Sequence, residues 1–144
     1  SSYFVNQYYK PEIKYSLTDF FIKFATSSID LSDGMIADLE KLTNNQNNSY
    51  QIYFDKIPLS NNLKSIIKSK NLIKKNLISK GDDYQVLFTA NSRDRSFIKK
   101  ISSLKKLKIT RIGKILHSKH KSSIIDRKGR QIEISNKGYI HTFD

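Results

Sequence analysis

The apolar residues of this chain recur at helical spacing in some segments and at strand spacing in others, and the order of these segments limits the fold more than any other feature. Apolar side chains recur at helical spacing over residues 12–26 and 93–107 and from Met35, after Gly34, to near Thr43. Residues 50–55 instead alternate between apolar and polar side chains, and residues 85–90 are β-rich and apolar on both faces, as in a central strand. Strands and helices do not alternate strictly. The sequence therefore predicts an α/β (α+β) fold, a mixed β-sheet with packed helices.

The remaining segments predict shorter elements. We expect residues 1–10 to form an irregular arm, and Ser60 to cap the first of two short helices. Residues 109–116 have the pattern of a strand, although Gly113 weakens its middle. A hairpin is expected over residues 124–134. No Gly- or Ser-rich linker divides the chain, so we expect a single domain.

Composition limits the class of protein. With 144 residues, 38% of them hydrophobic, the chain is long enough for one domain with a core. The sequence has no run of eighteen apolar residues, so it predicts no membrane span. It also has no recognisable secretory signal. The absence of cysteine excludes disulfides and thiolate metal sites and fits a reducing compartment, so we expect a cytoplasmic protein.

The chain is strongly basic, but its charge is unevenly distributed. The net charge is +13, with five lysines against seven acidic residues in 1–60 and 21 basic against six acidic residues in 61–144. Such a charge is typical of proteins that bind nucleic acids. However, only five basic residues are arginine, and the abundant lysine, isoleucine and asparagine all have A- and T-rich codons. We therefore expect the charge to attract phosphorylated ligands and do not expect a nucleic-acid partner.

A polar motif lies where a short extended segment is predicted to turn into a helix. Asp30, Ser32 and Asp33 stand just ahead of Gly34, and Asp30 and Ser32 share one side of an extended backbone. These oxygens and the positive end of the helix suit a phosphate and its metal ion. The alternative is a simple helix cap by Ser32 or Asp33, which this segment alone favours. A simple cap leaves Asp30 and Gly34 unexplained.

A second acidic group, Asp82 and Asp83, precedes the predicted strand over residues 85–90. Neither acidic group has a histidine or cysteine beside it, and carboxylates alone suit Mg²⁺ that is shared with substrate phosphates. His117 and His120 are close to lysines, which favours a solvated basic loop over a metal site. The five glycines are not clustered, so the sequence has no Walker-type phosphate loop.

Four segments carry a resemblance to a known family. In chain order they are residues 28–39, Ile57-Pro58-Leu59-Ser60, Gly81-Asp82-Asp83-Tyr84, and Gly138-Tyr139 with His141 and Phe143. The first resembles the second-domain signature of the thiamine-monophosphate kinase family, within the aminoimidazole ribonucleotide synthetase and selenophosphate synthetase superfamily. The others resemble that family's Leu-Pro-Leu-Ser, its Gly-Gly-acid-Asp-Tyr-Glu-Leu-Leu-Phe and its closing Gly-Tyr/Trp-Asp-His-Phe. The ordered set is more specific than any one motif.

The resemblance implies a function. It implies an ATP- and Mg²⁺-dependent phosphorylation of thiamine monophosphate to thiamine diphosphate. The positions of Asp30 and Asp33 would bind magnesium, and that of Ser32 would contact ATP. The position of Asp82 would lie against the thiamine substrate, and the aromatic ring at Tyr139 would pack on it. Metals held by carboxylates agree with phosphoryl transfer, which needs positioning and charge neutralisation rather than a covalent nucleophile.

The sequence also departs from the family pattern. Lys80 replaces the first glycine of the Gly-Gly pair, and Ile140 stands where the family has aspartate. The family's N-terminal domain is missing and the first residue is Ser1, so residues 1–144 resemble the C-terminal domain of a longer kinase. We expect this domain to be inactive alone, to pair with its N-terminal domain, and to dimerise when full length.

Two other classes of function remain as alternatives. One is another ATP-dependent synthetase of the same superfamily, although the Tyr84 and Tyr139 segments favour the thiamine branch. The other is a basic nucleic-acid-binding module, for which no stacking or groove-reading group is recognisable.

Overall fold

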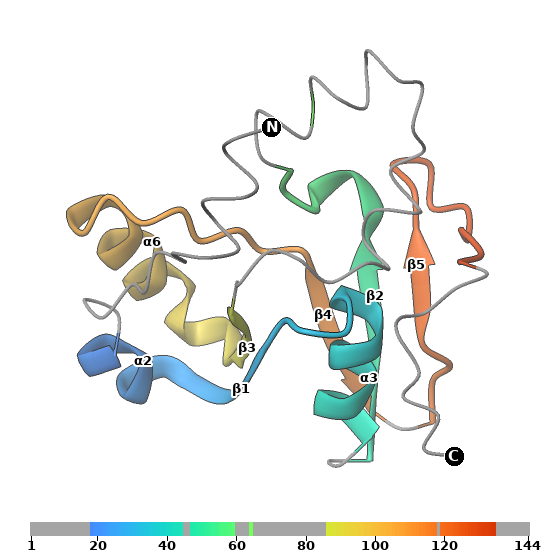
Figure 1. Ribbon diagram of the computed structural model, residues 1–144, viewed down its shortest axis with the longest axis horizontal. Helices are drawn as coiled ribbons and strands as arrows, with labels where there is room; N and C mark the ends of the chain where they lie inside the picture. The colour runs from blue at the N-terminus through green and yellow to red at the C-terminus, as the bar shows by residue number, and fades with distance from the viewer. Residues whose placement is uncertain (1–17, 45–46, 60–63, 65–85, 118, 135–144) are drawn as a thin grey trace. The chain divides into compact units, whose positions relative to one another are not determined.

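The computed structural model describes residues 18–44, 47–59, 64, 86–117 and 119–134 (Figure 1). Its contacts divide the chain into two compact units, formed by residues 1–32 with 82–109 and by residues 33–81 with 110–144. The prediction of a single domain stays a prediction. None of the helices in the described ranges has the length and apolar character needed to span a bilayer.

The first unit is a two-stranded sheet with helices. Its described elements, in chain order, are α2 (Thr18–Phe24), β1 (Ala25–Asp30), β3 (Val86–Ala90), the 3-10 turn η3 (Ser92–Asp94) and α6 (Arg95–Leu104). β1 pairs antiparallel with β3, from Ala25 opposite Ala90 to Asp30 opposite Val86, with a bulge after Ala25. β1 therefore ends at Asp30, the first acidic residue of the polar motif, opposite Val86 at the start of β3.

Aromatic rings form the core of the first unit. The Phe88 ring on β3 lies 4.8 Å from that of Phe21 and 5.4 Å from that of Phe24, and Phe97 on α6 lies 6.2 Å from Phe24, measured between centroids. The tilted and edge-on angles between these rings are the favoured geometry for aromatic pairs. Phe21 and Phe24 of α2 therefore pack against β3 in the core of this unit.

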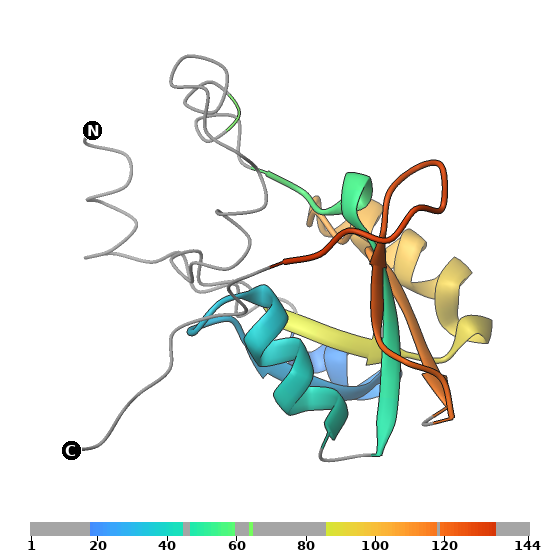
Figure 2. The ribbon, with the colours of Figure 1, turned by 90° about the vertical axis from the view of Figure 1, so that its right-hand side faces the viewer.

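The second unit is a mixed sheet covered by a helix. Its described elements, in chain order, are α3 (Met35–Asn44), β2 (Asn48–Tyr53), the 3-10 turn η2 (Phe54–Lys56), β4 (Gly113–His117) and β5 (Ser123–Ile125). The strand order is β4-β2-β5, with β2 antiparallel to β4 and parallel to β5. Figure 2 shows α3 alongside β2, and Figure 1 shows β4 and β5 on either side of β2. The buried side chains of this unit come mainly from α3, β2 and β5: Met35, Ile36, Leu39, Leu42, Tyr50, Ile52, Ile57 and Ile124.

A buried phenol ties α3 to β2. The hydroxyl of Tyr50, a residue only 4% exposed, donates a hydrogen bond to Glu40 Oε1 at 3.2 Å. A buried hydroxyl needs such a partner, because leaving it unpaired costs about 1–3 kcal/mol. This contact fixes the middle of the helix on the central strand of the mixed sheet.

Replacing Tyr50 with phenylalanine is expected to lower the free energy of unfolding by about 1 kcal/mol, because the hydrogen bond is lost while the ring stays. Burial and the Glu40 carboxylate raise the pKa of Tyr50 above the ordinary 10.0. The phenol therefore contributes stability below pH 10.0 that is lost progressively as the pH rises further, since the unfolded chain ionises first. Urea unfolding at neutral and at strongly alkaline pH should show a smaller alkaline decline in the variant. Identical declines would contradict this role of Tyr50.

The mixed α/β fold predicted from the sequence is confirmed, and the differences lie in the limits and pairing of its elements. The helix expected over 12–26 ends at Phe24, one residue before β1 begins, and the helix expected over 93–107 is α6, Arg95–Leu104. The expected strand over 109–116 begins only at Gly113, and the hairpin is reduced to β5 and a single bridge from Ile125 to Gln131. β3 was expected to be central, yet in the described part of the chain it pairs with β1 alone and its Val86 is 50% exposed. The arm over residues 1–10 and both helices after Ser60 lie outside the described residues.

Candidate functional site

The acidic motif lies at a turn from strand to helix, as the sequence predicts. β1 ends at Asp30 and α3 begins at Met35. Between them Gly34 has a φ of 119°, which a residue with a side chain rarely adopts. The same glycine accepts the first helical hydrogen bond, from Asp38 N–H at 3.0 Å. The turn thus requires glycine at position 34 because of its positive φ. The turn places Asp33 at the N-terminal end of the helix.

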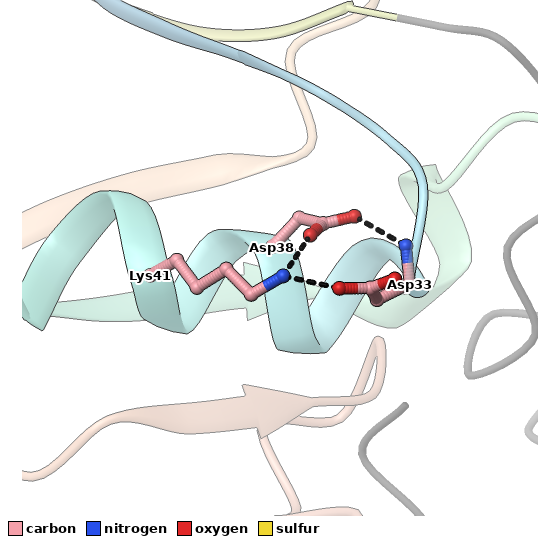
Figure 3. Close-up of polar contacts among 3 residues, drawn as sticks. All are labelled: Asp33, Asp38 and Lys41. Carbon is pink, nitrogen blue, oxygen red and sulfur yellow. Dashed lines mark hydrogen bonds and ion pairs between the residues drawn. The ribbon is translucent and has the colours of Figure 1, made fainter. Parts of the chain in front are cut away.

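A three-residue charge cluster surrounds the start of α3 (Figure 3). The ammonium of Lys41 forms ion pairs with the carboxylates of Asp33 and of Asp38, the second at 3.1 Å between Nζ and Oδ1. The other oxygen of Asp38 accepts a hydrogen bond from the backbone N–H of Asp33 at 3.0 Å. We call Asp33, Asp38 and Lys41 the α3 charge cluster. It closes a ring of polar contacts in which each member touches both others.

Burial differs sharply among the members of the α3 charge cluster. The Asp38 side chain is 1% exposed, that of Asp33 21% and that of Lys41 51%. Hydrogen bonds to Asp33 and then to Asp38 raise the pKa of Lys41 above its ordinary value of 10.5, so the ammonium is charged at neutral pH. Asp38 is therefore held in place by burial, whereas the half-exposed side chain of Lys41 can change its conformation in solvent.

The cluster bears on the alternative of a simple helix cap. Asp38, inside the helix, accepts a hydrogen bond from the backbone N–H of Asp33, five positions ahead of it in the chain. The Asp33 carboxylate is directed at the Lys41 ammonium. The carboxylate oxygens of Asp33 are of the kind that Mg²⁺ prefers, and the predicted role of Asp33 as a metal ligand stays a prediction.

The sequence predictions did not include Asp38 or Lys41 among the site residues. A signal was present, because an acidic residue three positions before a lysine lies on the same face of a helix. What the spacing alone does not tell is that the same lysine also reaches Asp33, which lies outside the helix.

The other predicted site residues are placed as follows. Asp30 and Ser32 belong to the first compact unit and Asp33 to the second. Asp82 and Tyr139 lie outside the described residues. The roles of all five predicted site residues stay predictions. Within the described ranges, no three histidine, cysteine, aspartate or glutamate side chains are grouped as a metal would require. His117 and His120 are both exposed, but His117 is the last residue of β4, where it pairs with Asn48, so only His120 lies in the predicted basic loop. The backbone N–H of His120 donates a hydrogen bond to the carbonyl of His117 at 3.0 Å.

Comparison with solved structures defines the class of fold. The chain superposes on 37% of a thiamine-monophosphate kinase from Stenotrophomonas maltophilia K279a with a TM-score of 0.71 and 25% identity, using 85% of its own length. It also matches 40% of AaThiL complexed with AMPPCP and TMP, with a TM-score of 0.69, 24% identity and 96% of this chain covered. The described units therefore have the fold of the aminoimidazole ribonucleotide synthetase class.

Sequence comparison identifies the relatives within that class. The chain is 32% identical over 119 residues, 83% of its length, to the thiamine-monophosphate kinase of Buchnera aphidicola subsp. Acyrthosiphon pisum (strain APS). The predicted resemblance to thiamine-monophosphate kinases is thus confirmed over most of the chain. The chain spans only 36% of that relative's length. No family model matches the sequence.

Proposed function

We propose that the full-length protein is a thiamine-phosphate kinase and that this chain is its C-terminal domain. In this reaction a phosphate oxygen of thiamine monophosphate bonds to the γ-phosphorus of ATP, the bond to the bridging β–γ oxygen breaks, and ADP leaves. The observation that carries the proposal is the 32% identity to a thiamine-monophosphate kinase across 83% of this chain. The motif around Asp33 lies within a strand-turn-helix that suits phosphate and metal.

The ligands proposed for this chain are supported by a structural relative. AaThiL has been solved in complex with AMPPCP and TMP. AMPPCP is an ATP analogue whose β–γ bridge is a methylene group, so its γ-phosphoryl group is not transferred. ATP and thiamine monophosphate are the corresponding substrates proposed here. In this proposal Ser32 contacts ATP, while Asp82 and Tyr139 lie against the thiamine substrate.

Carboxylates rather than a nucleophile form the proposed chemical machinery. Asp30 and Asp33 would hold Mg²⁺, which would neutralise charge on the phosphates during transfer. The acceptor oxygen of thiamine monophosphate is already ionised at neutral pH, so no side chain has to remove a proton from it and no catalytic base is assigned. The protein's own part is to orient two anions that repel each other and to exclude water between them.

A substrate test decides between this function and its rivals. The full-length protein should form thiamine diphosphate from ATP and thiamine monophosphate when Mg²⁺ is present, and chelation of the metal should stop the reaction. Residues 1–144 alone should show no turnover. Activity only with another superfamily substrate would overturn the assignment. Binding of labelled RNA or DNA that persists at physiological salt would instead favour the nucleic-acid-binding module. A homodimer and a cytoplasmic location stay predictions.

A further inference from the structure

We propose that Lys41 is a built-in counter-ion that competes with the divalent cation for Asp33. The inference rests on the proposed function, because that function makes Asp33 a metal ligand. It concerns a residue for which the family resemblance implies no role. In this view Lys41 is a positioning residue that holds the Asp33 carboxylate in the absence of the cation and lowers the affinity of the site.

The geometry of the α3 charge cluster carries this inference. The Lys41 ammonium lies between two carboxylates and pairs with both (Figure 3). A cation that binds the Asp33 carboxylate must share or displace this ammonium, because both positive groups are attracted to the same oxygens. The ion pair with Asp33 is therefore a cost that cation binding has to overcome.

The carboxylate of Asp38 lowers the free energy needed to displace the Lys41 ammonium from Asp33. Asp38 is almost fully buried and is anchored by the Asp33 backbone N–H, so it stays in place when Asp33 changes partner. Lys41 is half exposed, and its Nζ already lies 3.1 Å from Asp38 Oδ1. On release from Asp33 the ammonium keeps one ion pair and gains water. Lys41 therefore lowers the affinity for the cation without preventing binding.

Two substitutions should act in opposite directions. Lys41→Met removes the competing charge and should tighten binding of Mn²⁺ by about two- to fivefold, the scale of a partly exposed ion pair. Asp38→Asn keeps an acceptor for the Asp33 N–H but leaves the ammonium with Asp33 as its remaining carboxylate, so it should weaken Mn²⁺ binding. A purely structural role would weaken binding in both variants.

Mn²⁺ is a suitable probe because it prefers the same oxygen ligands as Mg²⁺, and its free form is measured directly by electron paramagnetic resonance. The titration uses the full-length protein. Lys41→Arg, which keeps the charge, should bind Mn²⁺ like the unmodified protein. Lys114→Met, on the exposed side of β4, is the matched control for loss of one lysine charge and should also leave binding unchanged.

A double-mutant cycle confines the effect to one carboxylate. In an Asp33→Asn background the effect of Lys41→Met should vanish, while Mn²⁺ sites elsewhere contribute equally to both proteins. Circular dichroism checks that each variant is folded. Where Lys41→Met fails to fold because Asp38 loses its charge partner, the double variant Lys41→Met/Asp38→Asn is compared with Asp38→Asn, and it should bind Mn²⁺ more tightly.

The outcomes separate this inference from the function on which it rests. A folded Lys41→Met protein, or the double variant, that binds Mn²⁺ no more tightly than its reference overturns the inference. If Asp33→Asn weakens Mn²⁺ binding in that same experiment, the proposed function stands. If Asp33→Asn leaves Mn²⁺ binding unchanged, Asp33 is not a ligand and the inference falls with that assignment, while the turnover test with thiamine monophosphate decides the function separately.

Discussion

Replacing Asp33 with asparagine is expected to lower the turnover of thiamine monophosphate by the full-length protein by about 10²-fold, the usual scale for loss of one preorganised electrostatic contact in a transition state. Asparagine keeps the shape of the side chain but carries no negative charge. In the proposed function it could no longer balance the charge of a Mg²⁺ ion held against the phosphates. Phosphoryl transfer is especially sensitive to such a loss, because positioning and charge neutralisation supply most of the rate.

The effect of this substitution on stability should be small. The ion pair between Asp33 and Lys41 is partly exposed, and such pairs contribute about 0–1 kcal/mol. Lys41 also keeps its contact with Asp38. A large loss of turnover in a protein with an unchanged urea midpoint would therefore report on the site rather than on folding.

The matched control is Asp55→Asn. Asp55 is a carboxylate of the same compact unit, 37% exposed, whose ion pair with Arg127 spans 3.7 Å. Its substitution removes one negative charge without touching the motif, so turnover should stay close to that of the unmodified protein. Turnover that falls equally in the two variants, or that survives in Asp33→Asn, would remove Asp33 from the proposed mechanism.

The strand-turn-helix around Gly34 could be predicted because its signals are local. A glycine, a stripe of apolar residues at helical spacing and the oxygen-bearing residues ahead of it all lie within about a dozen positions of the sequence. α3 consequently begins and ends within a residue or two of its expected limits. The β-rich run that forms β3 was found for the same reason.

Features that depend on distant partners could not be predicted. β4 begins at Gly113 because that is where the pairing with Ile52 of β2 begins, and the apolar pattern of residues 109–112 carries no information about that partner. The exposure of Val86 likewise depends on which strands flank β3. The contact of Lys41 with Asp33 joins a helical residue to one outside the helix, so no helical period reveals it.

Gly113 is the position at which the sequence signal was misread. A glycine inside an apolar run was expected to weaken a strand, since it has no side chain to pack. In the structure a Cβ at this position would lie 2.4 Å from the backbone oxygen of Gln51 and 2.8 Å from Cδ1 of Ile52. The strands β2 and β4 can approach this closely only because residue 113 has no side chain. Glycine is thus required by the pairing rather than tolerated in it.

Gly113→Ala is therefore expected to destabilise the second unit by about 3 kcal/mol, the upper range for overpacking a site that cannot relax. The obstacle is a backbone carbonyl of the central strand, which cannot move without breaking the pairing with β4 or β5. Because α3 is fixed to β2 through Tyr50 and Glu40, a shift of that strand would also disturb the helix that carries the α3 charge cluster. Turnover by the full-length protein should fall together with stability.

Gly129→Ala is the comparison that separates this clash from the general cost of replacing a glycine. Gly129 has a φ of 77°, but nothing lies within 4 Å of a Cβ placed there. Its substitution should cost about 1 kcal/mol from backbone strain alone. The urea midpoints rank the stabilities of the two variants, provided that the slope of the unfolding free energy against urea concentration is the same for both. If Gly113→Ala is no less stable than Gly129→Ala, the close approach of β2 and β4 is not what requires glycine at position 113.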